Sequence, residues 1–236
     1  FIVAGSSNNG LLLSRFDLDG NQVWEILVDT TTNIETALLM DESDGNFLLA
    51  ASADADSLDA GDNAILFIRF DTTGMVHERK LTSWPGYVSF SAAGKDNSGN
   101  IYFAVTRRNA GSKSRASVAK FSAELAELWE TELFNNPSFS SSSLSVKYYD
   151  NNIFVSGMTE IPSGDGALRN SFITSVDPAG RIAAGWDKKY PEFSNAGSDI
   201  EFDLNDNILL LNKNCMMLDL LNRTDGTIMA SVRTFN

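Results

Sequence analysis

The chain has 236 residues and a formal net charge of −13, with one cysteine and one histidine. This charge argues against nucleic-acid binding, because phosphate contacts need basic patches, and against docking on anionic lipid. The single cysteine, Cys215, excludes an internal disulfide and a cysteine metal cluster. No apolar run approaches the length of a membrane span.

Five units follow one another along the chain, at residues 1–29, 32–83, 86–135, 140–192 and 198–236. The first unit contains three predicted strands, at 1–6, 11–17 and 22–28, and its expected first strand is missing. The second contains four, at 35–40, 47–52, 65–70 and 76–81. Apolar runs separated in this way by Asp, Gly, Asn and Ser are typical of an all-β domain. Helical periodicity occurs only briefly, at 123–129, where other units have a turn.

Two markers recur with one period of about 53 residues. An Asn opens a strand at Asn46, Asn100, Asn152 and Asn207, which lie 54, 52 and 55 residues apart. An Asp-x-x-Gly turn begins at Asp17, Asp71 and Asp177, with steps of 54 and 106 residues. Such a period indicates a solenoid, a propeller or an array. Four short strands in each unit favour a β-propeller, since a parallel β-helix needs shorter rungs and an array of sandwiches needs longer units.

The number of blades stays open from the sequence. Propellers commonly have four to eight blades, and four complete units plus three strands do not close a ring neatly. Either the chain is the C-terminal part of a larger propeller, or it is a five-bladed ring in which one blade lacks a strand. Because Phe1 begins inside a strand, we expect that residues upstream of it, and any targeting signal, are missing. We expect 1–236 to form a single β-propeller domain.

The repeat resembles that of a known group of proteins. Asp44-Gly-Asn-Phe-Leu-Leu-Ala-Ala51 is followed by a polar loop and by Ile65-Leu-Phe-Ile-Arg-Phe-Asp-Thr-Thr-Gly74. Over nearly the whole chain this pattern resembles the repeats of bacterial secreted and surface β-propellers, which read D-G-G/N-Y-I-L-A-G and then D-x-x-G-x-x-x-W. The Trp of that pattern is present as Trp24 and Trp129, whereas Glu78 replaces it in the second unit. The resemblance implies a propeller at an extracellular, cell-surface or periplasmic location, but no single activity.

Acidic turns are the candidate metal sites. Asp17, Asp19, Asp41 and Asp44 place several oxygens within a few residues, and calcium prefers such ligands. None of these turns completes the D-x-[DN]-x-[DN]-G-x5-E loop. Asp, Asn and Gly also dominate ordinary turns, because they tolerate left-handed geometry and bond their own backbone. We therefore expect turns without a cofactor, with calcium as the alternative.

A second candidate site lies in the fifth unit. Alternation along 199–204 places Asp199, Glu201 and Asp203 on one face of a strand. Other units have small or apolar residues at the positions of Asp199 and Glu201. If the strand lines the central channel of a propeller, these carboxylates could hold a cation or act as acid and base. The other interpretation is an edge strand with a solvated face.

Aromatic side chains near the unit junctions are candidate sugar-binding groups. Trp84 and Trp186 lie at such junctions, and we expect them either to stack on a glycan or to fill the core. Trp24 and Trp129 recur with the repeat, which favours packing between blades.

The sequence offers little for nucleophilic or nucleotide chemistry. His77 is the single histidine, so a Ser-His-Asp arrangement would have to use it, and its place in an outer strand predicts an exposed residue. Zinc sites built on several histidines are excluded, and no Gly-rich phosphate-binding loop is present. Hydrolysis of glycosides by two carboxylates stays open, because the pair has to be found in space.

We favour a non-catalytic protein, because the chain is acidic, has one cysteine and offers few catalytic groups. The resemblance to secreted and surface propellers favours the same interpretation. We expect a secreted or cell-surface β-propeller that acts as a binding, adhesion or scaffold module. Its partner would be a protein or a glycan, and the chain would be part of a larger chain or assembly, without nucleic acid and without insertion into a membrane. The alternative is a carbohydrate-active hydrolase or lyase that uses carboxylates at the mouth of the propeller channel.

Overall fold

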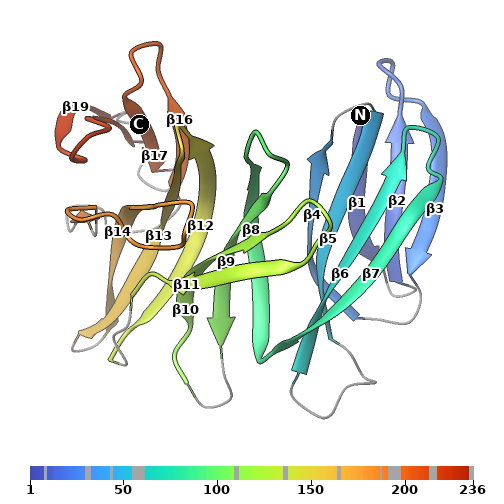
Figure 1. Ribbon diagram of the computed structural model, residues 1–236, viewed down its shortest axis with the longest axis horizontal. Helices are drawn as coiled ribbons and strands as arrows, with labels where there is room; N and C mark the ends of the chain where they lie inside the picture. The colour runs from blue at the N-terminus through green and yellow to red at the C-terminus, as the bar shows by residue number, and fades with distance from the viewer. Residues whose placement is uncertain are drawn as a thin grey trace. The chain divides into compact units, whose positions relative to one another are not determined.

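The regular structure in the computed structural model consists of antiparallel β-strands (Figure 1). The described residues are 1–7, 10–29, 33–42, 45–54, 62–108, 112–134, 138–163, 166–186, 188–190, 198–212 and 217–233. Contacts between Cα atoms divide the chain into two compact units, Phe1–Phe90 and Ser91–Asn236. In the described part of the chain, no helix is long and apolar enough to cross a membrane.

Two sheets follow each other in the first compact unit. The first sheet has the strand order β1-β2-β3, with bounds Ile2–Ser7, Gly10–Phe16 and Gln22–Asp29. The second sheet has the order β4-β5-β6-β7, with bounds Asn33–Asp41, Asn46–Asp54, Asp62–Asp71 and Val76–Pro85. Each strand pairs antiparallel with the next, so the chain crosses each sheet from one edge to the other.

Three more four-stranded sheets follow along the chain. The third sheet contains β8 to β11, with bounds Tyr87–Lys95, Ile101–Arg108, Arg115–Phe121 and Glu127–Glu132. The fourth contains β12 to β15, with bounds Ser140–Tyr149, Asn152–Ser163, Gly166–Val176 and Lys188–Tyr190. The fifth contains β16 to β19, with bounds Ser198–Phe202, Ile208–Asn212, Met217–Leu221 and Ile228–Arg233.

These sheets coincide with the five units that the repeat predicts, including the missing strand of the first one. The expectation of an all-β chain built from units of up to four strands is confirmed. Residues 123–129 form a turn and the start of β11, and not a helix. The single domain expected over 1–236 stays a prediction, and Cys215 lies outside the described residues.

Apolar side chains hold neighbouring sheets together within each compact unit. Between the first and second sheets the buried cluster contains Leu11, Leu13, Leu49, Ala51, Leu66, Ile68 and Phe70. Between the third and fourth sheets it includes Tyr102, Val118, Val146, Val155 and Phe172. Between the fourth and fifth sheets it includes Phe154, Ile173, Ile200, Ile208 and Leu210. Alternate side chains of a strand point to opposite faces, so one face of each of these strands lies in such a cluster.

An aspartate side chain stabilises the hairpin turns by accepting hydrogen bonds from backbone N–H groups of its own turn. Asp71 Oδ1 accepts hydrogen bonds from the backbone N–H groups of Thr73 at 2.8 Å and Met75 at 3.1 Å. Gly74 donates its own N–H to Asp71 O and has a φ of 86°, which glycine adopts without steric cost. The exposed His77 places Nε2 3.0 Å from Asp71 Oδ2. These contacts lower the pKa of Asp71 to about 2, and the hydrogen bond from the Thr73 hydroxyl is the largest cause.

The same turn recurs in both compact units. In each case the aspartate that begins the turn accepts hydrogen bonds from the backbone N–H groups two and four residues later. These aspartates are Asp17, Asp96, Asp177 and Asp203. In the turn between β10 and β11, Ser122 replaces the aspartate, and its hydroxyl accepts from the N–H groups of Glu124 and Ala126. Leu125 and Asp206 replace the glycine with φ angles of 62° and 65°. The turn geometry is therefore kept even where its usual residues are lost.

A tryptophan ties two of these turns to the preceding sheet. Nε1 of Trp24 on β3 donates to Thr72 O, and Nε1 of Trp129 on β11 donates to Pro178 O, both at 3.0 Å. The ring of Trp129 also covers Gly180, where an added Cβ would lie 3.0 Å from it. Both tryptophans are partly buried, and the turn carbonyl gives each indole N–H a hydrogen-bond partner. This contact explains why the tryptophan recurs with the repeat.

Gly180→Ala is expected to lower the melting temperature more than Gly99→Ala. Both glycines have a left-handed φ, 85° and 82°, so each variant carries a backbone cost of about 1 kcal/mol. The new Cβ at Gly180 would meet Trp129 and Thr131 at 3.0 to 3.2 Å, whereas at Gly99 the nearest atom lies at 3.5 Å. Thermal melting of the two variants measures the difference.

Trp129→Ala provides the control for this comparison. Without the indole ring, the difference in cost between Gly180→Ala and Gly99→Ala should shrink to the part that comes from Thr131. An equal loss from the two glycine variants in the otherwise unchanged chain would contradict the role of Trp129 in covering the turn.

Asp71 should stabilise the folded chain most in neutral solution. Its pKa falls from 3.8 to about 2 on folding, so its stabilising effect is present above the unfolded value and is lost as the pH falls from about 4 toward 2. Asp71→Asn should therefore lower the melting temperature at pH 7 and lower it less at pH 2. The exposed Asp19, changed to Asn, serves as the control and should have little effect at either pH. A loss of the same size at both pH values would speak against this role.

Candidate active site

Asp199 and Glu201 lie on β16, an edge strand of the fifth sheet. The expected alternation is present, because Ile200 between them is fully buried. Ser145 Oγ donates a 2.8 Å hydrogen bond to Asp199 Oδ1, and Lys147 Nζ forms a 2.6 Å ion pair with Glu201 Oε1. Ser145 and Lys147 belong to β12, an edge strand of the fourth sheet. A polar row therefore joins the first strands of two neighbouring sheets.

This row is more exposed than most reaction sites. The side chain of Glu201 is 64% exposed and that of Lys147 is 39% exposed. Asp203, which the alternation places on the same face, instead begins a turn and accepts from the N–H groups of Asn205 and Asn207. The expectation of three carboxylates on one face is thus corrected to two. Exposed ion pairs of this kind contribute little to stability.

Trp84 and Trp186 are buried. Their exposed fractions are 3% and 5%. Trp84 packs near Phe90, with ring centres 6.1 Å apart, and Trp186 stands edge-on to Phe154 at 5.3 Å. Both rings fill the cores of their compact units, which is the second of the two roles expected from the sequence, and neither presents a face to a sugar.

The acidic turns use their carboxylates locally. Asp17 Oδ1 accepts from the N–H groups of Asp19 and Asn21, and hydrogen bonds from Asn21 lower the pKa of Asp17. Asp41 ends β4 with an exposed side chain, and Asp44 lies outside the described residues. Within the part of the chain that the structure describes, no group of three or more His, Cys, Asp or Glu is placed to hold a metal ion. Calcium binding at these turns stays a prediction.

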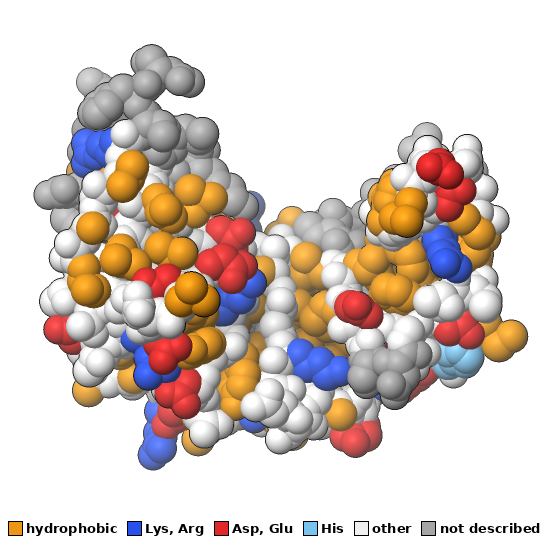
Figure 2. Space-filling view, turned by 90° about the horizontal axis from the view of Figure 1, so that it is seen from above, with side chains coloured by type: hydrophobic (Ala, Val, Ile, Leu, Met, Phe, Trp, Pro, Cys, Tyr) orange, Lys and Arg blue, Asp and Glu red, His pale blue; other side chains and the backbone are white. Residues whose placement is uncertain are grey.

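The charge of the surface does not point to one site. On the face shown in Figure 2, Asp and Glu side chains lie singly or next to Lys and Arg, with apolar side chains between them. The net charge of −13 is therefore not gathered into one patch on this face.

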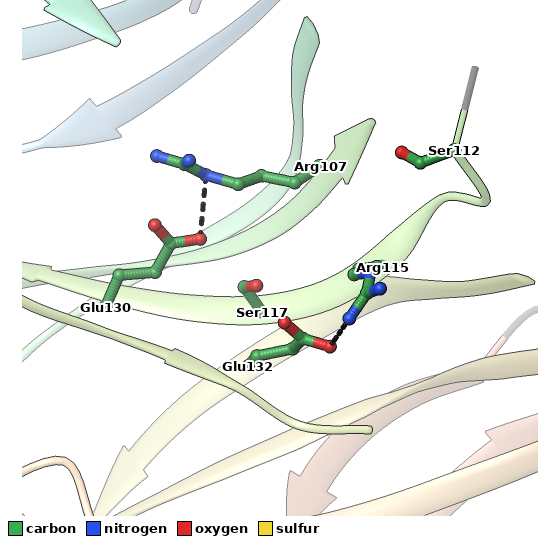
Figure 3. Close-up of a pocket in the computed structure, with 6 residues that line it drawn as sticks. All are labelled: Arg107, Ser112, Arg115, Ser117, Glu130 and Glu132. Carbon is green, nitrogen blue, oxygen red and sulfur yellow. Dashed lines mark hydrogen bonds and ion pairs between the residues drawn. The ribbon is translucent and has the colours of Figure 1, made fainter. Parts of the chain in front are cut away.

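A pocket of about 450 Å³ lies in the third sheet, within the range of roughly 300–1,000 Å³ common for small-ligand sites. Six polar residues line it, namely Arg107, Ser112, Arg115, Ser117, Glu130 and Glu132. Figure 3 shows them on β9, β10, β11 and the connection between β9 and β10, with each glutamate facing an arginine. None of the six is among the candidates that the sequence predicts.

Strand register brings these side chains to one face of the sheet. Arg115 pairs with Arg107, and Ser117 pairs with Glu132. Glu130 precedes Glu132 by two residues, so its side chain points to the same face. The opposite face is apolar and packs on the fourth sheet. The pocket face is also apolar farther along the strands, where Phe103, Val105 and Ala119 are fully buried.

The two glutamates have different surroundings. Arg107 Nε lies 2.9 Å from Glu130 Oε1, and Arg115 Nη1 lies 2.5 Å from Glu132 Oε1. The side chain of Glu130 is 17% exposed and that of Glu132 is 35% exposed. Burial raises the pKa of Glu130 and outweighs the opposing effects of Arg107 and of a hydrogen bond with Ser117. Glu130 therefore holds a proton to higher pH than an ordinary glutamate.

Such a pair is suited to acid–base chemistry. The Cα atoms of alternate strand residues are about 7 Å apart, so the flexible side chains of two such glutamates can reach the separation of roughly 6.5–9.5 Å between the carboxyl groups of inverting glycoside hydrolases. A protonated carboxyl can donate to a leaving group while an ionised one draws a proton from water. Asp199 and Glu201 have the same spacing along their strand, but Glu201 lacks the burial of Glu130.

A comparison of the repeats singles out one of the pocket residues. Counted from the Asn that opens the strand, Arg107 stands where two other units have Ala53 and Thr159. Counted from the turn, Glu132 stands where two other units have Leu27 and Leu81. A charge where those other units are uncharged is a signal that could have found Arg107, but it does not single out Glu132, because the fourth unit has Asp187 at the matching position.

No family model matches the sequence, and no curated protein is significantly similar to it. Solved structures are similar in fold. An α-L-arabinanase of Penicillium chrysogenum complexed with arabinobiose has a TM-score of 0.60 and 11% identity, over 96% of this chain and 78% of its own. The GH43 protein BlXynB of Bacillus licheniformis has a TM-score of 0.51 and 9% identity, over 96% and 51%. The Synechocystis apocarotenoid oxygenase has a TM-score of 0.52 and 10% identity, over 98% and 57%.

This chain spans little more than half the length of the last two proteins. The proteins with a similar fold thus include an arabinanase and a GH43 protein. The expectation of a non-catalytic binding, adhesion or scaffold module is therefore corrected in favour of its alternative. At 9 to 11% identity the likeness shows the fold, and the choice of activity rests on the site.

Proposed function

We propose that this chain is part of a β-propeller glycoside hydrolase in which Glu130 is the general acid and Glu132 the general base. One observation carries the proposal. The two glutamates share a pocket and one face of the third sheet, but they differ in burial, and each lies beside an arginine. The likeness in fold to an arabinanase and to a GH43 protein supports the same class of reaction.

The propeller is supported by the way the sheets follow one another. In the second compact unit the first strands of successive sheets lie together. An added Cβ at Gly94 on β8 would lie 3.5 Å from Val146 O on β12, and Lys147 on β12 contacts Glu201 on β16. Propeller blades surround a central channel, and these strands would line it. We propose that the five sheets of this chain are the blades of one ring.

Hydrolysis follows from the placing of the two carboxyl groups. Glu130 donates its proton to the glycosidic oxygen as the bond from that oxygen to the anomeric carbon breaks. Glu132 takes a proton from a water molecule that attacks the anomeric carbon from the opposite side. The leaving sugar departs as an alcohol, and the new reducing end has the inverted configuration. Exchange of protons with solvent then restores both glutamates.

Each arginine affects the protonation of the glutamate beside it. The ion pair with Arg115 uses the ionised form of Glu132, which is the form a general base needs. Arg107 opposes the effect of burial on Glu130, so the pKa of Glu130 is raised without the full effect of desolvation. A general acid must give up its proton in the reaction as well as hold it beforehand, and this balance serves both needs.

The oxygenase among the similar structures raises a second class of activity, which the composition disfavours. Non-haem iron oxygenases with a facial triad bind iron through two histidines and a carboxylate. This chain has one histidine, His77, whose ring lies beside Asp71. The residues of the chain therefore suit hydrolysis better than iron chemistry.

A glycan is then the partner of the site. We place the protein at an extracellular, cell-surface or periplasmic location, because its repeat resembles that of bacterial secreted and surface propellers. This location is part of the proposal.

Glu130→Gln and Glu132→Gln should each slow glycoside hydrolysis by about 10²- to 10⁴-fold, the contribution of one positioned acid or base. The measurement is the release of reducing sugar from a panel of neutral and acidic oligosaccharides. Circular dichroism checks that the variants are folded.

Glu124→Gln is the matched control, because Glu124 is an exposed carboxylate in the turn before β11, and it should keep full activity. Glu201→Gln tests the rival pair on β16. Loss of hydrolysis in Glu201→Gln, with full activity in Glu130→Gln, would move the reaction away from the third sheet. Failure of the unchanged protein to cleave any glycan would contradict the proposed function.

The pH profile of hydrolysis should show the titration of Glu130. As the acid it must be protonated, so kcat/KM should fall as the pH rises through its raised pKa. Arg107 lowers this pKa, so Arg107→Gln should move the basic limb of the profile to higher pH. Rates measured across the pH range for both proteins give the shift. A limb that stays in place or moves to lower pH would rule out Glu130 as the acid.

A further inference from the structure

Two arginines stand opposite each other in the third sheet. Arg107 on β9 and Arg115 on β10 pair directly across the strands, and both line the pocket. Like charges at directly opposite positions destabilise a sheet. Here Glu130 and Glu132 offset that effect, with one carboxylate beside each guanidinium group.

The charges of these four side chains balance only while both glutamates are ionised. Glu130 is the more buried of the two, and burial raises its pKa. As the acid of the proposed reaction, Glu130 carries a proton when the substrate binds. The four side chains then have one net positive charge, which favours an anionic group in the pocket.

The shape of the guanidinium group suits a carboxylate. An arginine carries five N–H donors in a planar fork, and such forks bind carboxylates through two parallel hydrogen bonds. The contact from Arg107 to Glu130 is made by Nε, and the contact from Arg115 to Glu132 is made by Nη1.

From this geometry we propose that the pocket recognises the carboxylate of an acidic sugar, bound by Arg107 and Arg115. The inference rests on the proposed function, since it takes the pocket to be the glycan site. Ser112, on the rim between β9 and β10, has a hydroxyl that can donate to or accept from a sugar hydroxyl. The substrate class is then a glycan that contains uronic acid.

The net charge of the chain restricts which glycans with uronic acid can be substrates. A polymer with a carboxylate on every sugar is repelled by a protein of charge −13. A single carboxylate on a neutral chain responds mainly to the charges nearest to it, because salt screens charges farther away than about 8–10 Å. The substrate is therefore a neutral glycan with isolated uronic acid residues, and not a polyuronate.

Binding of small probes tests this inference without any hydrolysis. Methyl glucuronoside and its methyl ester have nearly the same shape, but only the first carries a charge. In NMR titrations the acid should bind the unchanged protein about tenfold more tightly than the ester, the gain expected of hydrogen bonds to a charged group. Arg107→Gln and Arg115→Gln should each remove most of this preference, and Arg107→Lys should keep part of it.

Lys113→Gln is the matched control, because Lys113 is exposed and near Arg115 but does not line the pocket. It should keep the full preference. Equal binding of acid and ester by the unchanged protein would overturn the inference, as would an unchanged preference in folded Arg107→Gln and Arg115→Gln. A preference for the acid in a protein that cleaves no glycan would support the inference and overturn the proposed function. Tighter binding of a polyuronate fragment than of a neutral oligosaccharide with one uronate would overturn the restriction to isolated acids.

Discussion

An aspartate that binds the backbone of its own turn is the interaction on which the sheets depend. Asp17, Asp71, Asp96, Asp177 and Asp203 each accept two N–H groups from the residues that follow. The bound carboxylate stabilises the left-handed residue of the turn and so sets the register of the two strands that meet there. With the register set, alternate apolar side chains reach the neighbouring sheet. Trp24 and Trp129 then attach the turn itself to the sheet before it.

The same interaction distinguishes the aspartates of the turns from the proposed catalytic acid. A carboxylate that accepts hydrogen bonds from its own turn has a lowered pKa, as in Asp71, and serves poorly as a proton donor. Glu130 is the opposite case, because burial on the pocket face raises its pKa. The aspartates that begin the repeated turns therefore stabilise the sheets, and the proposed acid, Glu130, lies outside those turns.

The fold could be predicted from the sequence because its markers act locally. Asn46 and Asp71 each predict a turn from the chemistry of a few neighbouring residues. The period between such markers then predicts how the chain is divided into sheets. The site could not be predicted in this way. Arg107, Arg115 and Glu130 come from three strands and meet only through the pairing of those strands, and the burial of Glu130 depends on residues distant in sequence. For the pair on β16, alternation correctly placed Asp199 and Glu201 on one face, but their partners on β12 and the exposure of Glu201 required the structure.

The acid–base pair in the third sheet exists only if Glu130 holds its proton to higher pH than an ordinary glutamate. A carbon-13 NMR titration of the Glu130 carboxyl in the unchanged protein, assigned with Glu130→Gln, measures this directly and needs no substrate. We predict a midpoint above 4.5, the ordinary value for glutamate. A midpoint at or below that value would show that Arg107 outweighs burial, and would contradict the assignment of Glu130 as the acid.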